Sequence, residues 1–388
     1  AHLLQRHGVG GGLRWALAGR NRARLQAVRE QLGEAAADLP LLEADSHDRN
    51  SLDRLVTRTR VVCTTVGPYA LHGSELVAAC AAAGTDYCDL AAELPWMRQM
   101  MDAHADTAEG SGARILHCCG FDSIPSDLGV QLLQTQARER FGEAAERVRM
   151  RVKAARGGLS GGTFASMLNI IEQSRKDKAI ARLLKNPYTL CPTDAREGVR
   201  QPYVAGPGYD RELEVWLAPF IMAAINTRVV HRSNALAGFA YGREFRYDEA
   251  VMTGKGWRGR ARAIGLSAGM GGFALASSFA PTRAAMKRMF LPKPGQGPSA
   301  QQREAGFFNI ILSGRTAQGE RCDVQVKGDR DPGYGATSRM IGEVAAALAL
   351  ETDDGSVGGG FWTPATALGD HLRERLTTHA GMNFKALD

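Results

Sequence analysis

Short apolar runs alternate with longer amphipathic segments through the first 130 residues. The apolar runs predict strands and lie at residues 13–18, 39–45, 60–67, 87–90 and 113–119. The intervening segments predict helices and lie at residues 21–33, 51–58, 73–83 and 95–109. Continuous apolar strands that alternate with helices are typical of a parallel sheet buried on both faces. The pattern predicts an α/β fold, a Rossmann-type doubly wound parallel sheet.

A glycine cluster, HGVGGGLRWALAGRN, covers residues 7–21. A dinucleotide-binding loop has a strand before its glycines and a helix after them, because the pyrophosphate sits on the helix N-terminus. Here a strand-like run follows the glycines, and residues 1–7 are typical of a helix end. We predict a helix-to-strand connector with Gly8 as the helix cap. The first strand and the true phosphate loop are then expected upstream of Ala1, and a phosphate loop within the cluster is the alternative.

The pattern changes at about residue 147, where residues 148–154 alternate like a half-exposed antiparallel strand. Further strands are predicted at 213–219 and 226–232, a hairpin at 308–313 and 322–327, and helices at 336–350 and 364–377. This predicts a second, α+β substrate domain. The expected divisions are a nucleotide-binding domain at 1–130, the substrate domain at 131–354, and a C-terminal helix and tail at 355–388.

Charge is concentrated in one part of the chain, whose net charge is +7. Between residues 254 and 294 there is no Asp or Glu, and the basic residues are Lys255, Arg258, Arg260, Arg262, Arg283, Lys287, Arg288 and Lys293. Residues 263–282 between them carry no charge and are too weakly apolar to predict a membrane span. Two interpretations remain open: a segment that lies on an anionic membrane surface, or a buried helical lid. Nucleic acid is disfavoured because aromatic residues do not alternate with the charges.

Composition is that of an ordinary soluble protein of two domains, with 388 residues, 44% hydrophobic and 23% charged. The seven cysteines lack the spacing of a disulfide framework and include no CxxC pair. We therefore expect a reduced, cytoplasmic protein without a metal site. Peripheral attachment to the cytoplasmic membrane is left open by the basic segment.

Several motifs occur in one order along the chain. The segments ALAGRN, TTVGPYALHG, AACAAAGTDYCDL and CGFDSIPSDLG resemble the saccharopine dehydrogenase-like oxidoreductases. The later segments APFIMAAINTRVVHRSNAL, YGREFRY, DPGYGATSRM and TPATALG are similar to the trans-acting enoyl reductase branch of that family. The resemblance extends from Leu13 to about Leu376. The chain departs from the family at one position of this motif. The family usually has Gly-Glu here, and this chain has Ala92 in place of the glycine before Glu93.

The resemblance implies an NADP(H)-binding Rossmann domain followed by an α+β substrate domain. It also implies reduction of a carbon–carbon double bond in a lipid or polyketide intermediate, carried on a carrier protein or acyl chain, as in glycolipid biosynthesis. The alternative is a non-catalytic lipid- or membrane-surface protein that keeps a degenerate Rossmann core.

Candidate cofactor contacts follow the predicted strands, because ligands bind at the carboxyl ends of parallel strands. Gly19, Arg20 and Asn21 end the strand that receives the adenosine ribose. No acid occurs between Gly19 and Arg29, so Arg20 is expected to bind the 2′-phosphate of NADP. The remaining candidates stand at the ends of the later strands and are Asp45, Val66, Gly67, Pro68, Gly120 and Phe121.

Reduction of an enoyl group needs a hydride at the β carbon, a proton at the α carbon, and donors for the charge on the carbonyl oxygen. Candidate proton donors are Tyr69, Asp122 and Tyr334. Structural alternatives are a packing role for Tyr69 and a turn at residues 331–334. Residues 160–163 open a helix whose amides could hold a carbonyl oxygen or phosphate, or else form a tight turn with a threonine cap.

Overall fold

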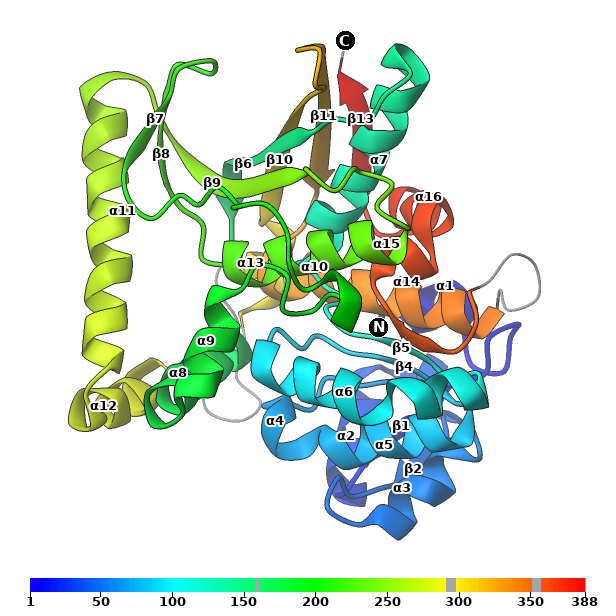
Figure 1. Cartoon of the computed structure of the whole chain (residues 1–388). Coiled ribbons are helices and arrows are strands. Elements are labelled where there is room, and N and C mark those ends of the chain that lie inside the picture. Colours follow the sequence, from blue (N-terminus) through cyan, green and yellow to red (C-terminus); the bar gives the residue numbers. More distant parts are fainter. Residues whose placement is uncertain (158–160, 291–297, 351–356, 388) are drawn as a thin grey trace.

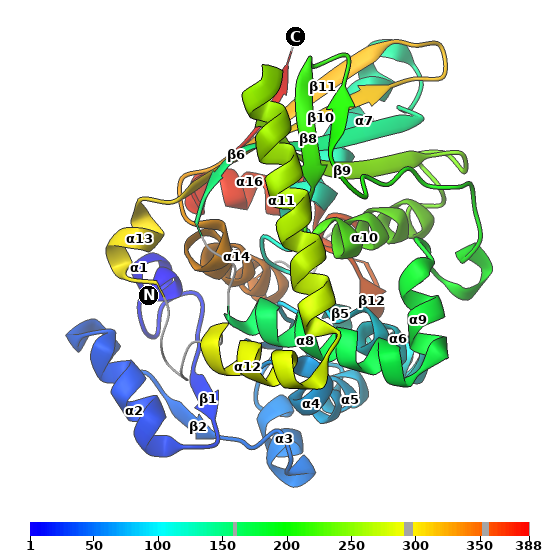
Figure 2. The ribbon, with the colours of Figure 1, turned by 90° about the vertical axis from the view of Figure 1, so that its left-hand side faces the viewer.

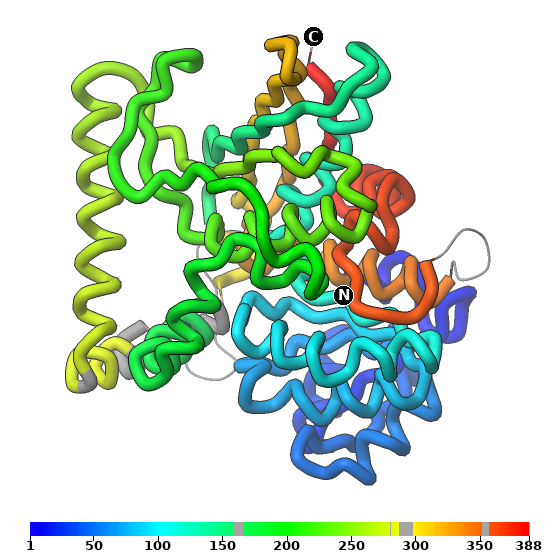
Figure 3. The backbone as a smooth tube through the Cα atoms, viewed as in Figure 1, coloured from blue at the N-terminus to red at the C-terminus, as the bar shows by residue number. Residues whose placement is uncertain are grey.

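The computed structural model describes residues 1–157, 161–290, 298–350 and 357–387. The backbone in Figure 3 divides into a blue-to-cyan region, built from the first third of the chain, and a green-to-orange region above it. The parallel strands lie in the first region, and a larger, mostly antiparallel sheet lies in the second (Figure 1).

The first region contains parallel strands in two groups. One sheet has the order β12-β5-β4-β3, and the other pairs β1 with β2. The strand bounds are β1 Leu17–Gly19, β2 Leu41–Glu43, β3 Val61–Cys63, β4 Asp86–Cys88, β5 Arg114–Leu116 and β12 Gly360–Trp362. Within the described ranges no strand joins β1 to β3. The parallel strands alternate with helices, and the predicted α/β class is confirmed.

Helices cover both faces of the parallel sheet. Helices α5 (Ser74–Ala83) and α6 (Leu94–Ser111) pack on one face, and α14 (Thr337–Leu350) packs on the other. Tyr87 and Ile115 enter the core with α5 and α6, whereas their neighbours Cys88 and Leu116 enter the core with α14. Because successive strand residues face opposite sides, burial on both sides requires the continuous apolar runs seen in the sequence.

The remaining helices of the first region connect or flank its strands. They are α1 His2–His7, α2 Arg22–Gln31, α3 Arg49–Val56, α4 Tyr69–His72 and α7 Ile124–Phe141. Helix α1 ends at Gly8, whose φ of 64° is a conformation that glycine adopts without strain. The glycine cluster therefore lies between a helix and a strand, which confirms the predicted connector.

The second region is built on one seven-stranded sheet with the order β13-β11-β10-β6-β9-β8-β7. Its strands are β6 Arg147–Arg156, β7 Gly208–Asp210, β8 Val215–Pro219, β9 Arg246–Gly254, β10 Phe307–Arg315, β11 Arg321–Gly328 and β13 Met382–Leu387. The predicted hairpin is confirmed, since β10 pairs with β11 from Phe308 opposite Gly328 to Arg315 opposite Arg321. Helix α7 crosses from the first region and packs on β10 and β11.

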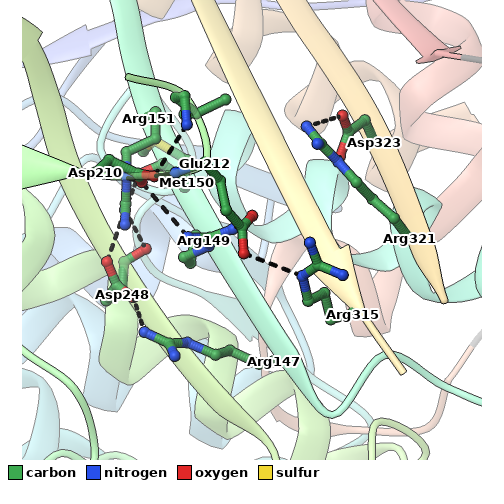
Figure 4. A network of polar contacts seen from close by, with 11 residues as sticks. Arg147, Arg149, Met150, Arg151, Asp210, Glu212, Asp248, Arg315, Arg321 and Asp323 are labelled. Carbon is green, nitrogen blue, oxygen red and sulfur yellow. Dashed lines mark hydrogen bonds and ion pairs between the residues drawn. The ribbon is translucent and has the colours of Figure 1, made fainter. Parts of the chain in front are cut away.

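Strand β6 is half-exposed, as the sequence predicts: on its polar face Arg147 and Lys153 are exposed, and Arg151 is buried. Val148, Met150 and Val152 face the core, and the arginines between them meet acids from neighbouring strands (Figure 4). Arg151 Nη1 lies 2.6 Å from Asp248 Oδ1 on β9, and both residues are 3% exposed. The predicted alternation is confirmed, and in the middle of the polar face, at Arg151, ion pairs take the place of solvent. Strand β6 pairs antiparallel with β10, as predicted, and parallel with β9.

Two elements of the second region differ from the sequence prediction. Residues 226–232, predicted as a strand, lie in helix α10 (Ala223–Leu236). Their β-branched residues favour strands locally, but Val230 is buried in the core with residues of α7 and β9, and Val229 is buried in the core of the parallel sheet with α5 and α6. Packing overrides the local preference. Strand β9 was not predicted because Asp248 and Glu249 interrupt its apolar pattern.

The segment 355–388, predicted as a helix and tail, supplies strands to both sheets. Strand β12 pairs in parallel with β5, and β13 pairs with β11. Between them the single predicted helix is divided into α15 (Pro364–Ala367) and α16 (Gly369–His379), where Gly369 has a φ of 44°. The domain limits at residues 130 and 355 stay a prediction, and α14 and β12 belong to the parallel sheet although they lie beyond residue 130.

A long helix, α11 (Gly256–Ser277), stands on the outside of the second region (Figure 1). Other helices near it or in this half are α8 Gly161–Lys176, α9 Lys178–Lys185, α12 Ala280–Phe290 and α13 Ala300–Glu304. Ile264, Leu266 and Leu275 on α11 are 48%, 50% and 64% exposed. This exposure contradicts the buried-lid interpretation of the segment. In the described part of the chain no helix has the length and apolarity needed to cross a bilayer.

Candidate active site

Most of the predicted site residues follow the carboxyl ends of β1, β3 and β5, whereas Asp45 follows β2 and Tyr334 lies between β11 and α14. In parallel strands these ends share one edge of the sheet, where ligands of doubly wound folds bind. Some side chains in these loops bind other parts of the protein and have a structural role. Others remain candidates for contact with a ligand.

Arg20 follows β1 and is exposed, without a hydrogen bond or ion pair to any described residue. Its neighbour Asn21 caps α2 by accepting a hydrogen bond from the backbone nitrogen of Arg24 at 3.0 Å. Gly19 lies opposite Glu43 in the β1–β2 pair. Asp45, beyond β2, accepts a hydrogen bond from the nitrogen of His47 at 3.0 Å. Asp45 therefore stabilises a turn, while the Arg20 guanidinium is available to a phosphate.

The loop after β3 presents Val66, Gly67 and Pro68 to the same edge, and Val66 is 53% exposed. Tyr69, which follows, is buried, and its hydroxyl donates to the carbonyl of Thr64 at 3.2 Å and accepts from the nitrogen of Leu90 at 3.1 Å. Burial raises the pKa of Tyr69 far above its ordinary value. These contacts favour the packing role of Tyr69 and do not support it as a proton donor.

Glu93 organises this part of the site and was not among the predicted site residues. Its buried carboxylate accepts hydrogen bonds from the backbone nitrogens of Tyr69 (2.8 Å) and Ala70 (3.1 Å) and from Ser166 Oγ (2.8 Å). It therefore joins the β3 loop, the β4 loop and helix α8. The preceding Ala92 occupies the position of the family glycine without preventing these bonds. The sequence feature that could have predicted this role is the position of Glu93, an acid between the end of a strand and the Leu-Pro start of a helix.

The loop after β5 is held by residues 332–337. A Cβ on Gly120 would lie 2.8 Å from Leu90 Cδ2 and 2.9 Å from Thr337 Cγ2, so only glycine fits. The Phe121 nitrogen donates to Thr337 Oγ1 at 3.0 Å, and its ring packs edge-on against Phe308 at 5.0 Å. Both residues have these structural roles, and their contact with the cofactor stays a prediction.

Asp122 lies between Phe121 and Ser123, which both form hydrogen bonds within the protein. In contrast, the Asp122 carboxyl makes no hydrogen bond to a described residue. It is half-buried in the loop after β5, and burial raises its pKa to about 7. A carboxyl with this pKa is substantially protonated at neutral pH and can act as an acid. Of the predicted proton donors, Asp122 therefore has a pKa suited to donating a proton near neutral pH, and its role stays a prediction.

The next residue, Ser123, has a φ of 121°, a conformation that is strained for any residue with a side chain. Its hydroxyl donates to Asn226 Oδ1 at 3.0 Å, and Asn226 Nδ2 donates to Glu249 Oε2 at 2.9 Å. Tyr247 donates to the other oxygen of Glu249 at 2.7 Å. This buried chain, which reaches from α10 and β9, holds the backbone that carries Asp122. Sequence analysis gave no indication of it.

The segment predicted as a turn at residues 331–334 instead opens a short π-helix, Pro332–Ala336, which Asp331 caps. The Asp331 carboxylate accepts hydrogen bonds from the backbone nitrogens of Gly333, Tyr334 and Gly335 at 2.8–3.3 Å. Tyr334 is half-buried and lies next to the Thr337 contact with the β5 loop. Helix α8 begins at Gly161, whereas Ser160 lies outside the described residues.

The residues present fit an NADP(H) molecule on the adenosine side. The exposed Arg20 guanidinium stands at the end of β1 without an ion pair among the described residues, and Glu43 on the facing strand is paired with Arg22 at 3.5 Å. A 2′-phosphate at this position would meet a cation without displacing an ion pair. Val66 and Gly67 would contact the molecule further along the same edge.

Comparison with known proteins agrees with this arrangement. The family described as Saccharopine dehydrogenase NADP binding domain matches residues 1–116. A protein of Mycobacterium tuberculosis (strain ATCC 25618 / H37Rv), provisionally named a trans-acting enoyl reductase, is 45% identical over 97% of this chain and 92% of its own. The trans-acting enoyl reductase of Mycobacterium ulcerans (strain Agy99) is 39% identical over 97% of this chain and 91% of its own.

A solved structure shows the same fold. Saccharopine dehydrogenase (L-Glu forming) from Saccharomyces cerevisiae aligns with a TM-score of 0.50 and 10% identity, covering 96% of this chain and 94% of that chain. With the matched NADP-binding domain and the unpaired Arg20, these likenesses identify NADP(H) as the cofactor. The chain belongs to the saccharopine dehydrogenase-like oxidoreductases, in the branch of the trans-acting enoyl reductases.

Proposed function

We propose that this oxidoreductase reduces a carbon–carbon double bond conjugated to a carbonyl group in a lipid or polyketide intermediate. The substrate is an acyl-type chain, held on a carrier protein, on the route to a glycolipid. The observation that carries the proposal is Asp122, a half-buried carboxyl with a pKa of about 7 at the edge of the NADP-binding sheet, which makes no hydrogen bond to the residues that the structure describes. The names of the relatives support the reaction class.

Bound NADPH supplies a hydride to the β carbon of the substrate. The electrons of the double bond then move onto the carbonyl oxygen, which becomes an enolate and needs hydrogen-bond donors. We assign these donors to backbone amides at the start of α8, and the hydrogen bond from Ser166 on that helix to Glu93, beside the β3 loop, supports the assignment. The protonated Asp122 delivers its proton to the α carbon and completes the reduction. Tyr334 is the second candidate for this proton.

The experiment compares three variants on a long-chain enoyl thioester with NADPH in D₂O. Mass spectrometry of the product locates deuterium at the α carbon. Asp122→Asn should lower kcat about 100-fold or more while NADPH binding is unchanged, and Tyr334→Phe tests the second donor. Tyr69→Phe is the control, which should lose stability and keep kcat.

Two results would contradict the proposal. Unchanged turnover in Asp122→Asn would remove the proton assignment, and reduction of a carbonyl or imine in place of the double bond would remove the reaction class. The natural substrate is sought in lipid extracts of a strain that lacks the gene. There the accumulating species should be two hydrogen atoms lighter than the normal product.

A further inference from the structure

Helix α11 leaves one apolar face uncovered along its whole length. With 3.6 residues per turn, Trp257, Ala261, Ile264, Ala268, Gly272 and Leu275 fall on one side, and we call this set the α11 stripe. All six residues are exposed, Trp257 by 76%, Ile264 by 48% and Leu275 by 64%. Figure 2 shows α11 running down the face that is turned to the viewer, in front of the rest of the chain.

The opposite side of α11 attaches the helix to the protein. Gly259 and Ala263 are buried where the helix packs on β8 and β9. A Cβ on Gly259 would lie 2.1 Å from the carbonyl oxygen of Gly254, so this approach requires glycine. The helix is therefore fixed by its small residues. The α11 stripe points outward because of the way the chain packs, over about 33 Å for 22 residues.

Three arginines accompany the α11 stripe without an acidic partner. Arg258 and Arg260 flank Trp257 on either side of the stripe, and Arg262 lies further round the helix. All three are exposed, and none forms an ion pair with a described residue. In contrast, Lys255 pairs with Glu214 at 3.1 Å and Arg283 pairs with Glu172 at 3.6 Å. The side chains of Lys287, Arg288 and Lys293 lie outside the described residues.

These arginines stand at the wrong end of the helix for its own stability. Cations stabilise a helix near its C-terminus and oppose the dipole near its N-terminus. Arg258, Arg260 and Arg262 occupy the first two turns of α11, which has no acid in its first turn. The guanidinium groups of Arg258 and Arg260 lie 5.5 Å from the ring centres of Trp257 and Trp216, but the stability of the helix does not explain the three charges.

We propose that the α11 stripe docks on an anionic lipid surface. Trp257, Ile264 and Leu275 insert at the boundary between head groups and acyl chains, and the three arginines contact anionic head groups. A second copy of this chain fits the face less well, because α11 contains no Asp or Glu and two copies would bring only like charges together. This inference does not depend on the proposed reaction.

The test is co-sedimentation of the full chain with vesicles of phosphatidylglycerol and phosphatidylcholine. Binding should require phosphatidylglycerol and weaken as salt is raised. The variant Arg258→Gln/Arg260→Gln/Arg262→Gln should partition at least about tenfold less. A control with the same loss of charge, Arg54→Gln/Arg58→Gln/Lys327→Gln, changes exposed residues elsewhere and should bind like the unmodified chain. Ile264→Ser/Leu275→Ser should lose binding while keeping the circular dichroism of the folded protein.

Three results would overturn the inference. The first is protein that stays in the supernatant with anionic vesicles at low salt. The second is equal loss of binding in both charge variants, which would indicate a diffuse effect of net charge. The third is a lipid-free dimer, seen by sedimentation equilibrium, that Ile264→Ser/Leu275→Ser dissociates, because that result would assign the face to a second copy.

Discussion

Asp122 is neutral at a pH where most carboxyls are ionised, because burial disfavours its charged form. The folded-state pKa of about 7 is higher than the ordinary value, so the folded state retains this proton as the pH rises. The contribution to stability is present at acidic pH and is lost as the pH rises through about 7. A carboxyl suited to donating a proton near neutral pH is therefore destabilising at alkaline pH.

The first prediction concerns the pH profile of enoyl reduction. Because the reaction consumes the proton of Asp122, kcat/KM should fall as the pH rises through about 7. In Asp122→Asn the remaining activity should lose this dependence, and the variant should be more stable than the unmodified protein at pH 8 but not at pH 4. Stopped-flow kinetics and urea unfolding at each pH measure the two effects. A variant that keeps the full pH profile would contradict the assignment.

The second prediction concerns Arg20. Its unpaired guanidinium should contribute about 1.5–3 kcal/mol to binding of the 2′-phosphate. Arg20→Ala should therefore bind NADPH about ten- to a hundredfold more weakly and leave NADH affinity unchanged. Isothermal titration with both cofactors gives the ratio. Arg54→Ala, at another exposed arginine, serves as the control, and equal discrimination in the two variants would argue against the role.

Among the elements, strand β6 shows how far a pattern alone can be interpreted. The alternation of residues 147–156 places the apolar side correctly, because strand geometry fixes which residues share a face. It does not reveal whether the other side meets water or an acid on a distant strand. Asp210 lies 59 residues after its partner Arg151, and Asp248 lies 101 residues after Arg147, so only the fold brings them together. Residues 226–232 were misassigned for the same reason.

In the candidate site, too, local features could be predicted from the sequence and contacts between distant segments could not. Arg20 and the strand-end loops could be predicted because they are local to β1, β3 and β5. Glu93 and the chain from Ser123 to Glu249 could not, since each acts through partners on other elements. The raised pKa of Asp122 could not be predicted either, because it results from burial, and the sequence alone does not show which residues surround this carboxyl.

The third prediction tests the ion pairs of β6. Asp248→Ala would leave the buried Arg151 with one fewer carboxylate partner, and such a loss costs about 3–5 kcal/mol of unfolding free energy. Asp323→Ala breaks an ion pair to Arg321, whose side chain is 42% exposed, and should cost at most about 1 kcal/mol. Urea unfolding measures the loss of unfolding free energy in each variant, and the loss should be larger in Asp248→Ala. Similar losses in the two proteins would mean that burial does not govern these pairs.

For the whole molecule, the segment 357–387 makes the two sheets interdependent. It places β12 against β5 and β13 against β11, and α14 from the preceding segment covers the parallel sheet. Arg232 on α10, in the second region, also donates to the carbonyl of Phe361 on β12. Neither sheet keeps its full set of partners if the other unfolds.

The fourth prediction follows from this connection. Phe361→Ala removes a buried ring from the parallel sheet and should cost about 3–5 kcal/mol. Calorimetry should show one transition that moves to lower temperature, with equal calorimetric and van't Hoff enthalpies. Phe307→Ala, at a residue 42% exposed on β10, should move it much less. Two separate transitions would contradict the interdependence.

The position of β12 also affects how the protein folds while it is being synthesised. A nucleotide-binding domain at the start of a chain ordinarily folds before the rest has left the ribosome. Here the neighbour of β5 is completed at Trp362, about 250 residues after Leu116, which corresponds to about 10–50 s of translation. During that interval the open edge of β5 and the apolar face later covered by α14 are exposed on the nascent chain. Chaperones that hold unpaired strands should therefore engage this protein until translation is nearly complete.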